Sequence, residues 1–173
     1  MDTKLLSLLI TLGLIAIAFA LIWMGWRNRL RRQSDVEQLP VVPEAPGEPF
    51  AAAEGQYVAS TTAGDWLDRI AVHALGIRTN ATLEVYRHGV LFDRSGAPAL
   101  YIPAASLAGV RLDSGMAGKF VEKDGLLVLA WEHGSHVLDT GFRTRRAEDR
   151  IVLIAALQEL ISSAPAADAN SGK

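Results

Sequence analysis

The sequence of 173 residues contains no cysteine. This absence excludes structural disulfides, thiolate metal sites, a cysteine nucleophile and a lipid anchor attached to cysteine. The chain also lacks an excess of either charge, because 17 Lys and Arg balance 19 Asp and Glu to a net charge of −2. A near-neutral chain argues against a dedicated nucleic-acid-binding protein, so no nucleic acid is expected among its partners.

Apolar residues make up half of the chain, and their excess is concentrated in one stretch. Residues 5–26 read LLSLLITLGLIAIAFALIWMGW, with 18 apolar residues among 22 and no charge. As a helix, this stretch is about 33 Å long, enough to cross a hydrocarbon core of about 30 Å. Trp23 and Trp26 lie near its end, where indole side chains favour the membrane interface. The sequence therefore predicts a transmembrane helix over 5–26, preceded by a short segment, 1–4.

A basic juxtamembrane segment, 27–33, follows the apolar run and sets its direction. It holds four cations, Arg27, Arg29, Arg31 and Arg32. The positive-inside rule then places the N-terminus outside and the C-terminal domain in the cytoplasm. A cleaved signal peptide is the alternative, but the run exceeds the usual 7–15-residue apolar core of such peptides. The prediction is a single-pass protein of the cell membrane that contacts the lipid bilayer through this helix.

Small residues lie near one face of the apolar stretch. Ala16 and Ala20 are four positions apart, and Gly13 lies close to the same face. Such spacing lets two membrane helices approach closely. A homodimer through the transmembrane helix is therefore one arrangement that the sequence allows.

Residues 34–53 differ in composition from the segments on either side. They contain four of the seven prolines, Pro40, Pro43, Pro46 and Pro49. A spacing of three matches the polyproline II turn, so this Pro-rich linker is interpreted as a semi-rigid spacer of at most about 60 Å. A PxxP recognition motif is the alternative. At the other end, residues 163–173 are mainly small and polar, which is typical of a disordered tail.

The remaining segment, 54–162, predicts one domain built mainly of short strands. The expected strands are 57–62, 82–87, 90–94, 99–102, 107–113, 119–122, 125–131 and 137–143. Residues 65–75 fit either a short amphipathic helix or a strand with a corner. The continuous apolar run at 125–131 predicts a central strand.

An amphipathic helix is predicted over 145–161, with Thr144 as its N-cap and acidic residues in the early helix. Its apolar stripe is predicted to face the sheet or a barrel mouth. The stripe consists of Ile151, Ile154, Leu157 and Ile161, widened by Val152, Leu153 and Leu160.

About seven antiparallel strands followed by one helix resemble the pleckstrin-homology-like (PH-like) fold, a partly open seven-stranded barrel. The resemblance is carried by LEVYRHGV at 83–90, YIPAASLAGV at 101–110 and the closing helix. Over residues 1–162, the chain resembles actinobacterial single-pass membrane proteins with a cytoplasmic bacterial PH-like domain. The resemblance implies no catalytic residues.

Two triplets, at 113–115 and 139–141, match the Asp-Ser/Thr-Gly signature of aspartic proteases. They lie too close in sequence to belong to two separate lobes, so a strand end and turn is the favoured interpretation. His133 and His136 flank a turn without a third metal ligand. The sequence therefore predicts no catalytic residue, no metal site and no cofactor.

Cations are the remaining candidates for a binding site. Arg143, Arg145 and Arg146 precede the last helix, and Lys119 and Lys123 lie in a nearby loop. They fit anionic lipid headgroups or an acidic partner. The favoured alternative is a solvated rim in which the arginines form salt bridges to Glu148 and Asp149. The leading hypothesis is a non-enzymatic module that binds a membrane or cytoplasmic protein, or acts as a scaffold, at the inner face of the membrane. The alternatives are an anionic-lipid sensor and, more remotely, an accessory subunit of a transport complex.

Overall fold

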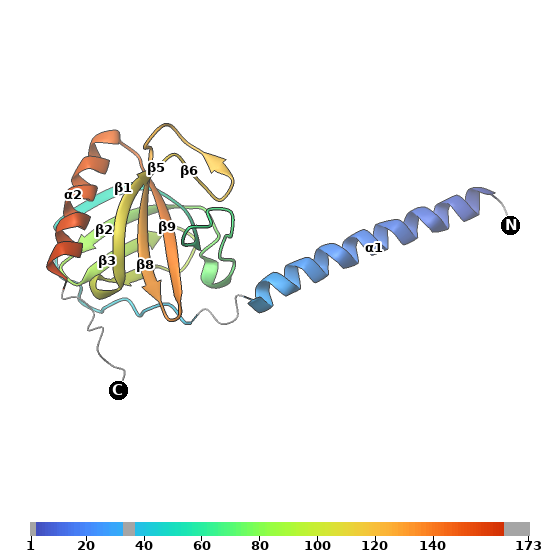
Figure 1. Cartoon of the computed structure of the whole chain (residues 1–173), viewed down its shortest axis with the longest axis horizontal. Helices are drawn as coiled ribbons and strands as arrows, with labels where there is room; N and C mark the ends of the chain where they lie inside the picture. Colours follow the sequence, from blue (N-terminus) through green and yellow to red (C-terminus); the bar gives the residue numbers. More distant parts are fainter. Residues whose placement is uncertain (1–2, 33–36, 165–173) are drawn as a thin grey trace. The chain divides into compact units, whose positions relative to one another are not determined.

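The computed structural model describes residues 3–32 and 37–164 (Figure 1). The chain divides into two compact units, Met1–Asp35 and Val36–Lys173. Helix α1 (Thr3–Arg32) forms the first unit. Its Ser7–Gly25 segment is long and apolar enough to cross a membrane, and its side chains are exposed within the chain.

Two features of α1 bear on the sequence predictions. The Thr11 hydroxyl donates a hydrogen bond of 2.9 Å to the Ser7 carbonyl, so this polar side chain is satisfied within the helix. Trp23 and Arg27 are exposed. The side chains of Trp26, Arg29, Arg31 and Arg32 lie outside the described residues.

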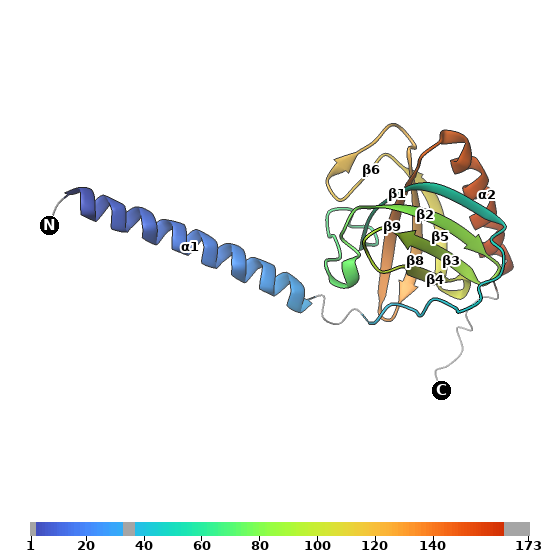
Figure 2. The same cartoon turned by 180° about the vertical axis from the view of Figure 1, so that it is seen from behind.

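A seven-stranded antiparallel sheet forms the second unit, in the order β4-β3-β2-β1-β9-β8-β5 (Figures 1 and 2). Its strands are β1 (Ala51–Thr62), β2 (Thr79–Tyr86), β3 (Gly89–Arg94), β4 (Leu100–Pro103), β5 (Leu107–Asp113), β8 (Leu126–His133) and β9 (His136–Thr144). A short hairpin, β6 (Gly115–Met116) with β7 (Lys119–Phe120), interrupts the path from β5 to β8. Helix α2 (Ala147–Ser163) ends the unit. This confirms the predicted fold class, and the sheet does not close because β4 and β5 do not pair.

The main core lies between the sheet and α2. Its fully buried side chains include Trp131, Tyr57, Phe92, Phe142 and Leu129, from β8, β1, β3 and β9. A smaller cluster of buried apolar residues lies apart from this core and joins the β6–β7 hairpin to β1 and β8. It consists of Val58, Met116, Leu126 and Val128. The hairpin therefore packs against the sheet instead of projecting freely from it.

A chain of buried polar contacts crosses the core. The Tyr57 hydroxyl lies 2.8 Å from Ser60 Oγ and donates to the Leu75 carbonyl at 2.8 Å. Ser60 Oγ lies 2.7 Å from Thr140 Oγ1, which accepts a hydrogen bond of 2.9 Å from the Trp131 indole. Every side-chain polar atom in this series of contacts has a hydrogen-bond partner, which is how polar groups are accommodated in an apolar core.

Burial of the tyrosines predicts a pH response. Desolvation raises the pKa of Tyr57 to about 12, and burial followed by the hydrogen bond to Glu84 raises the pKa of Tyr86 to about 12. The unfolded chain loses these protons near pH 10, so folding stability is intact below pH 10 and falls as the pH rises toward 12. For Tyr57 the loss amounts to about 3 kcal/mol. Absorbance at 295 nm should show tyrosinate in the denatured chain near pH 10 and in the native chain only at higher pH. Coincident titration curves would contradict this expectation.

Helix α2 corrects two sequence predictions. Its N-cap is Arg146 and not Thr144, because the Arg145 N–H still donates to the Glu54 carbonyl at 2.9 Å and extends the sheet. Ile151 was expected to face the core but is 73% exposed, and Val152 is exposed too. The buried face is instead formed by Leu153, Ala156, Leu157 and Leu160, at helical spacing.

The uncertain segment after β1 forms neither a regular α-helix nor a strand. It consists of turns, one bridge between Thr61 and Arg69, and a short 3₁₀ turn, η1 (Val72–Ala74). His73 and Ala74 have left-handed backbone angles, with φ of 55° and 57°. Such angles interrupt any regular helix at this point.

The Pro-rich segment lies along the domain instead of standing free as a spacer. The carbonyl of Glu37 lies 2.9 Å from His133 Nε2, and the His133 ring packs 5.2 Å from that of Trp131. Leu39 packs against the main core, and the Phe50 N–H donates to the Val85 carbonyl at 3.0 Å. Strand β1 then begins at Ala51, three residues before the predicted start of the domain. Residues 37–50 are therefore part of the domain surface.

Docking of this segment predicts protection from proteases. Leu39→Asp places a charge against the core and should release residues 37–50, raising their cleavage rate about tenfold. Val41→Asp is the matched control, because Val41 is exposed and touches no core cluster. Limited proteolysis with mass spectrometry measures both variants. Equal cleavage in the wild-type chain and in Leu39→Asp would show that the segment is not held.

Candidate functional site

An open hollow of about 700 Å³ lies where the outer face of the sheet meets the start of α2. We call it the arginine groove. Two rows of paired residues form its floor. One row runs Asp93–Thr82–Glu54 across β3, β2 and β1, and the other runs Asn80–Gln56–Arg143 across β2, β1 and β9. Strand register thus places donors and acceptors of several kinds side by side.

Three arginines line this groove: Arg143, Arg145 and Arg150. Arg145 also lines a neighbouring hollow of about 470 Å³ together with Arg146. Arg78 adds a cation beside the floor, since its guanidinium donates to the Gln56 side chain. The structure therefore brings the three predicted arginines to one face and adds Arg78 and Arg150, which sequence reasoning did not assign to the site. Alternation of exposed residues along β1 and β2 was the signal that a polar face existed here.

Each predicted arginine is paired with an acid. Arg143 Nη2 lies 2.8 Å from Glu122 Oε2, and Arg145 Nη1 lies 2.9 Å from Glu54 Oε2. Arg146 Nε lies 3.1 Å from Asp149 Oδ2. Arg145 and Arg146 are exposed and Arg143 is half-buried. Ion pairs at such positions contribute about 0–1 kcal/mol each, so a partner's charges can replace them at little cost.

Glu122 stays ionised under ordinary conditions. Its pKa lies below the usual value, first because its own backbone N–H bonds to the carboxylate, and also because Arg143 and Arg150 lie beside it. The groove therefore presents fixed positive and negative charges together.

The two predicted lysines lie elsewhere. Lys119 is in β7 and Lys123 is in the turn after it, and neither lines the arginine groove or its neighbour. Among residues 3–32 and 37–164, no ion pair includes either lysine. The predicted five-cation cluster is thus divided into an arginine face and a separate pair of lysines.

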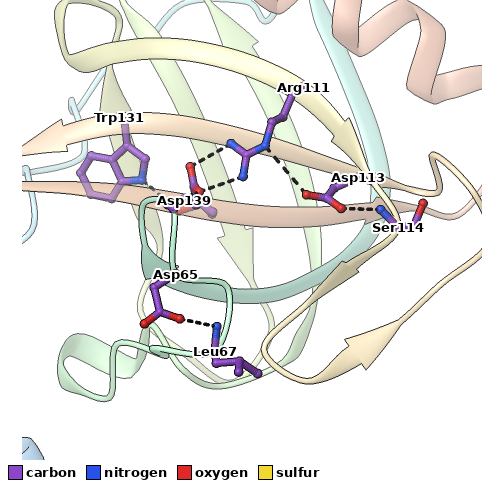
Figure 3. A network of polar contacts seen from close by, with 9 residues as sticks. Asp65, Leu67, Arg111, Asp113, Ser114, Trp131 and Asp139 are labelled. Carbon is purple, nitrogen blue, oxygen red and sulfur yellow. Dashed lines mark hydrogen bonds and ion pairs between the residues drawn. The ribbon is translucent and has the colours of Figure 1, made fainter.

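Figure 3 shows why the two Asp-Ser/Thr-Gly triplets do not form a catalytic dyad. The guanidinium of Arg111 donates to both carboxylate oxygens of Asp139, at 3.0 and 2.8 Å. It also lies 3.9 Å from Asp113, whose other oxygen accepts a hydrogen bond from the Ser114 N–H at 2.7 Å. Two carboxylates that share a proton must face each other, whereas a cation stands between these two. The two carboxylates therefore form no dyad. The first triplet lies at the end of β5, as expected, but the second lies within β9 and does not form the expected strand end and turn.

The two histidines also have structural surroundings. His133 contacts the Glu37 carbonyl, and His136 Nδ1 lies 3.4 Å from Ser135 Oγ. In the part of the chain that the structure describes, no group of three or more His, Asp or Glu side chains is placed to hold a metal ion.

The family of the domain follows from comparison with known proteins. Residues 36–158 match the family described as "Bacterial PH domain-like". The chain belongs to this family. The match includes the docked segment before β1, which agrees with its place on the domain. PH-like domains are generally non-catalytic modules that bind proteins or lipids. A comparison with curated proteins found no match.

Three solved structures are similar to this chain at low sequence identity. A chain of "The 8S snRNP Assembly Intermediate" aligns with a TM-score of 0.53 and 10% identity, covering 78% of this chain and 97% of that chain. A structure of inhibited Vav1 aligns at 0.41 with 19% identity, over 79% of this chain and 32% of that one. A C-terminal domain of an unknown protein from Leishmania infantum aligns at 0.38 with 10% identity, over 79% and 98%. The first of these supports the fold alone.

Proposed function

We propose that this chain is a non-enzymatic, membrane-anchored PH-like module that binds a protein partner at the inner face of the cell membrane. The arginine groove is the binding site in this proposal. The observation that carries it is the pairing of Arg143, Arg145 and Arg146 with acids on one polar face.

Matched charges favour a protein over a lipid surface. An anionic membrane attracts unpaired cations, whereas each of these arginines already lies beside a carboxylate. A polar protein segment with both charges can pair with the arginines and the acids at once. Gln56, Asn80 and Thr82 add neutral hydrogen-bonding groups that suit a peptide backbone. Sensing of anionic headgroups through the same arginines is the less favoured alternative.

Anchoring is supported by α1. Its Ser7–Gly25 segment is apolar, and none of it is buried among the residues that the structure describes. A bilayer is the environment in which a helix of this length and composition is stable. The basic segment after it supports a cytoplasmic domain by the positive-inside rule.

The test is site-specific photo-crosslinking of the full chain in its own membranes. A photoreactive side chain at Asn80, on the groove floor, should yield a protein adduct, and one at Gln158, on the exposed face of α2, should not. Arg143→Glu should reduce the yield of the Asn80 adduct about tenfold, because it removes a positive charge that the partner contacts. The double change Arg143→Glu with Glu122→Arg restores the internal ion pair in reversed orientation. The yield of the Asn80 adduct should stay low in this double variant if the partner contacts the charges of the groove.

Three outcomes would overturn the proposal. One is an adduct from Asn80 that contains only lipid. Another is an Asn80 adduct unchanged by Arg143→Glu. The third is full recovery in the double variant, which would mean that Arg143 serves the fold and not a partner.

A further inference from the structure

Three large apolar side chains are exposed together on two loops of the domain. Trp66 and Leu67 follow β1 and are 42% and 59% exposed, while Phe120 in β7 is 78% exposed. The rings of Trp66 and Phe120 lie 5.6 Å apart at an angle of 54°. We call these three residues the loop patch. An exposed aromatic cluster of this kind marks an interaction site, because folding gains nothing from leaving it in water.

The loop patch is held in place by the backbone beneath it. The Ala117 N–H donates to the Trp66 carbonyl at 2.7 Å, which joins the two loops. Arg69 Nη2 donates to the Ala117 carbonyl at 3.1 Å. Met116 is buried and anchors the β6–β7 hairpin against Val58 and Val128. The hydrogen bonds and the packing of Met116 thus hold in place the two loops that carry the three apolar side chains.

The surroundings of the loop patch combine both charges. Lys119 and Lys123 are exposed beside Phe120, and Asp65 lies next to Trp66. Exposed Trp, Phe and Leu with lysine nearby form the composition that favours the interfacial region of a bilayer. The mixed charge means that attraction to anionic lipid adds little, so apolar contact is the expected source of binding.

The length of chain between the apolar segment of α1 and the domain limits how far the domain can lie from the bilayer. Residues 33–36 alone separate the end of α1 at Arg32 from Glu37, which is docked on His133. Such a stretch spans at most about 18 Å. Residues 26–32 of α1 add about 10 Å of helix beyond the apolar segment, which ends at Gly25. The loop that carries Trp66 starts beside the same β8–β9 hairpin, because the Ala63 N–H donates to the Val137 carbonyl at 2.9 Å.

We propose that the loop patch inserts into the interfacial region of the bilayer in which α1 is anchored. The chain then contacts the membrane at two points, α1 and the patch. This inference rests on the anchoring proposed above and adds a second membrane contact that does not use the arginine groove.

The absence of cysteine makes the test simple, because a single introduced cysteine takes the only label. The full chain is reconstituted into nanodiscs of phosphatidylcholine, with an environment-sensitive fluorophore at Lys119→Cys beside the patch. The matched position is Gln158→Cys, exposed on α2, which covers a different side of the sheet (Figures 1 and 2). Quenching by nitroxide-labelled lipid should be several-fold stronger at 119 than at 158, with a blue-shifted emission. Added salt should leave it unchanged.

A second variant ties the signal to the patch. Phe120→Asp should return the label at 119 to the emission seen in water. Ile151→Asp, which changes an equally exposed apolar residue outside the patch, should have no effect. Equal quenching at 119 and 158, quenching lost in salt, or an unchanged signal in Phe120→Asp would overturn the inference. Failure of the anchoring proposal looks different, because the chain would then not co-elute with nanodiscs at all.

Discussion

Trp131→Ala is expected to lower the free energy of unfolding of the domain by about 3–5 kcal/mol. Trp131 is fully buried, and its indole N–H donates to Thr140 in the polar chain that continues through Ser60 to Tyr57. The change removes a large volume from the centre of the core and one donor from that chain. Domains of this size have stabilities of about 5–15 kcal/mol, so a large share of the free energy of unfolding is lost.

Thermal unfolding of a chain that begins at Val36, followed by circular dichroism, measures this effect as a fall in Tm of roughly 10–20 °C. Trp131→Phe is the control, since it keeps most of the volume and loses the N–H donor alone. It should cost about 1–2 kcal/mol. If the two variants had equal Tm values, the indole N–H and not the packing of Trp131 would carry the effect.

The second large effect is expected in α1. Changing Ile15 and Phe19 to lysine places two charges near the middle of the apolar segment. Each lysine costs about 2.5–3.5 kcal/mol at the centre of a membrane helix, so the pair should abolish stable insertion. Alkaline extraction of membranes should leave the wild-type chain in the pellet and release the double-lysine variant. Changing both residues to leucine is the control and should keep the chain in the pellet.

Extraction of the wild-type chain would contradict anchoring. The signal-peptide alternative predicts a different result, namely a mature chain that lacks the N-terminal residues by mass spectrometry. An intact chain in the pellet distinguishes the two interpretations.

Strands with regular alternation were predictable from the sequence. Predicted strand 107–113 coincides with β5. The apolar run at 125–131 begins one residue before β8 and ends two residues before the end of that strand. The buried face of α2 was not predictable, because residues 151–157 are all apolar and several helical faces fit them equally well. Burial by the sheet, and not the local pattern, selected Leu153 over Ile151.

Contacts between distant segments account for the remaining differences. Glu37 and His133 are 96 positions apart, so nothing in the Pro-rich composition indicated that the segment docks. Arg143 pairs with Glu122 because the chain that leaves the β6–β7 hairpin brings Glu122 beside it. Strand register places Arg143 next to Gln56. The sequence identified the arginines as a binding candidate and predicted Glu148 and Asp149 as their acidic partners, which holds for Arg146. It showed neither the partners of Arg143 and Arg145, Glu122 and Glu54, nor the loop patch.

The proposed function requires the domain to lie at the inner face of the membrane, and topology mapping tests this requirement most directly. Because the chain has no cysteine, Asp2→Cys and Lys173→Cys each carry one thiol. A membrane-impermeant maleimide is added to intact cells and then to permeabilised cells. The account predicts labelling of Asp2→Cys in intact cells and of Lys173→Cys only after permeabilisation. Labelling of Lys173→Cys in intact cells would contradict it.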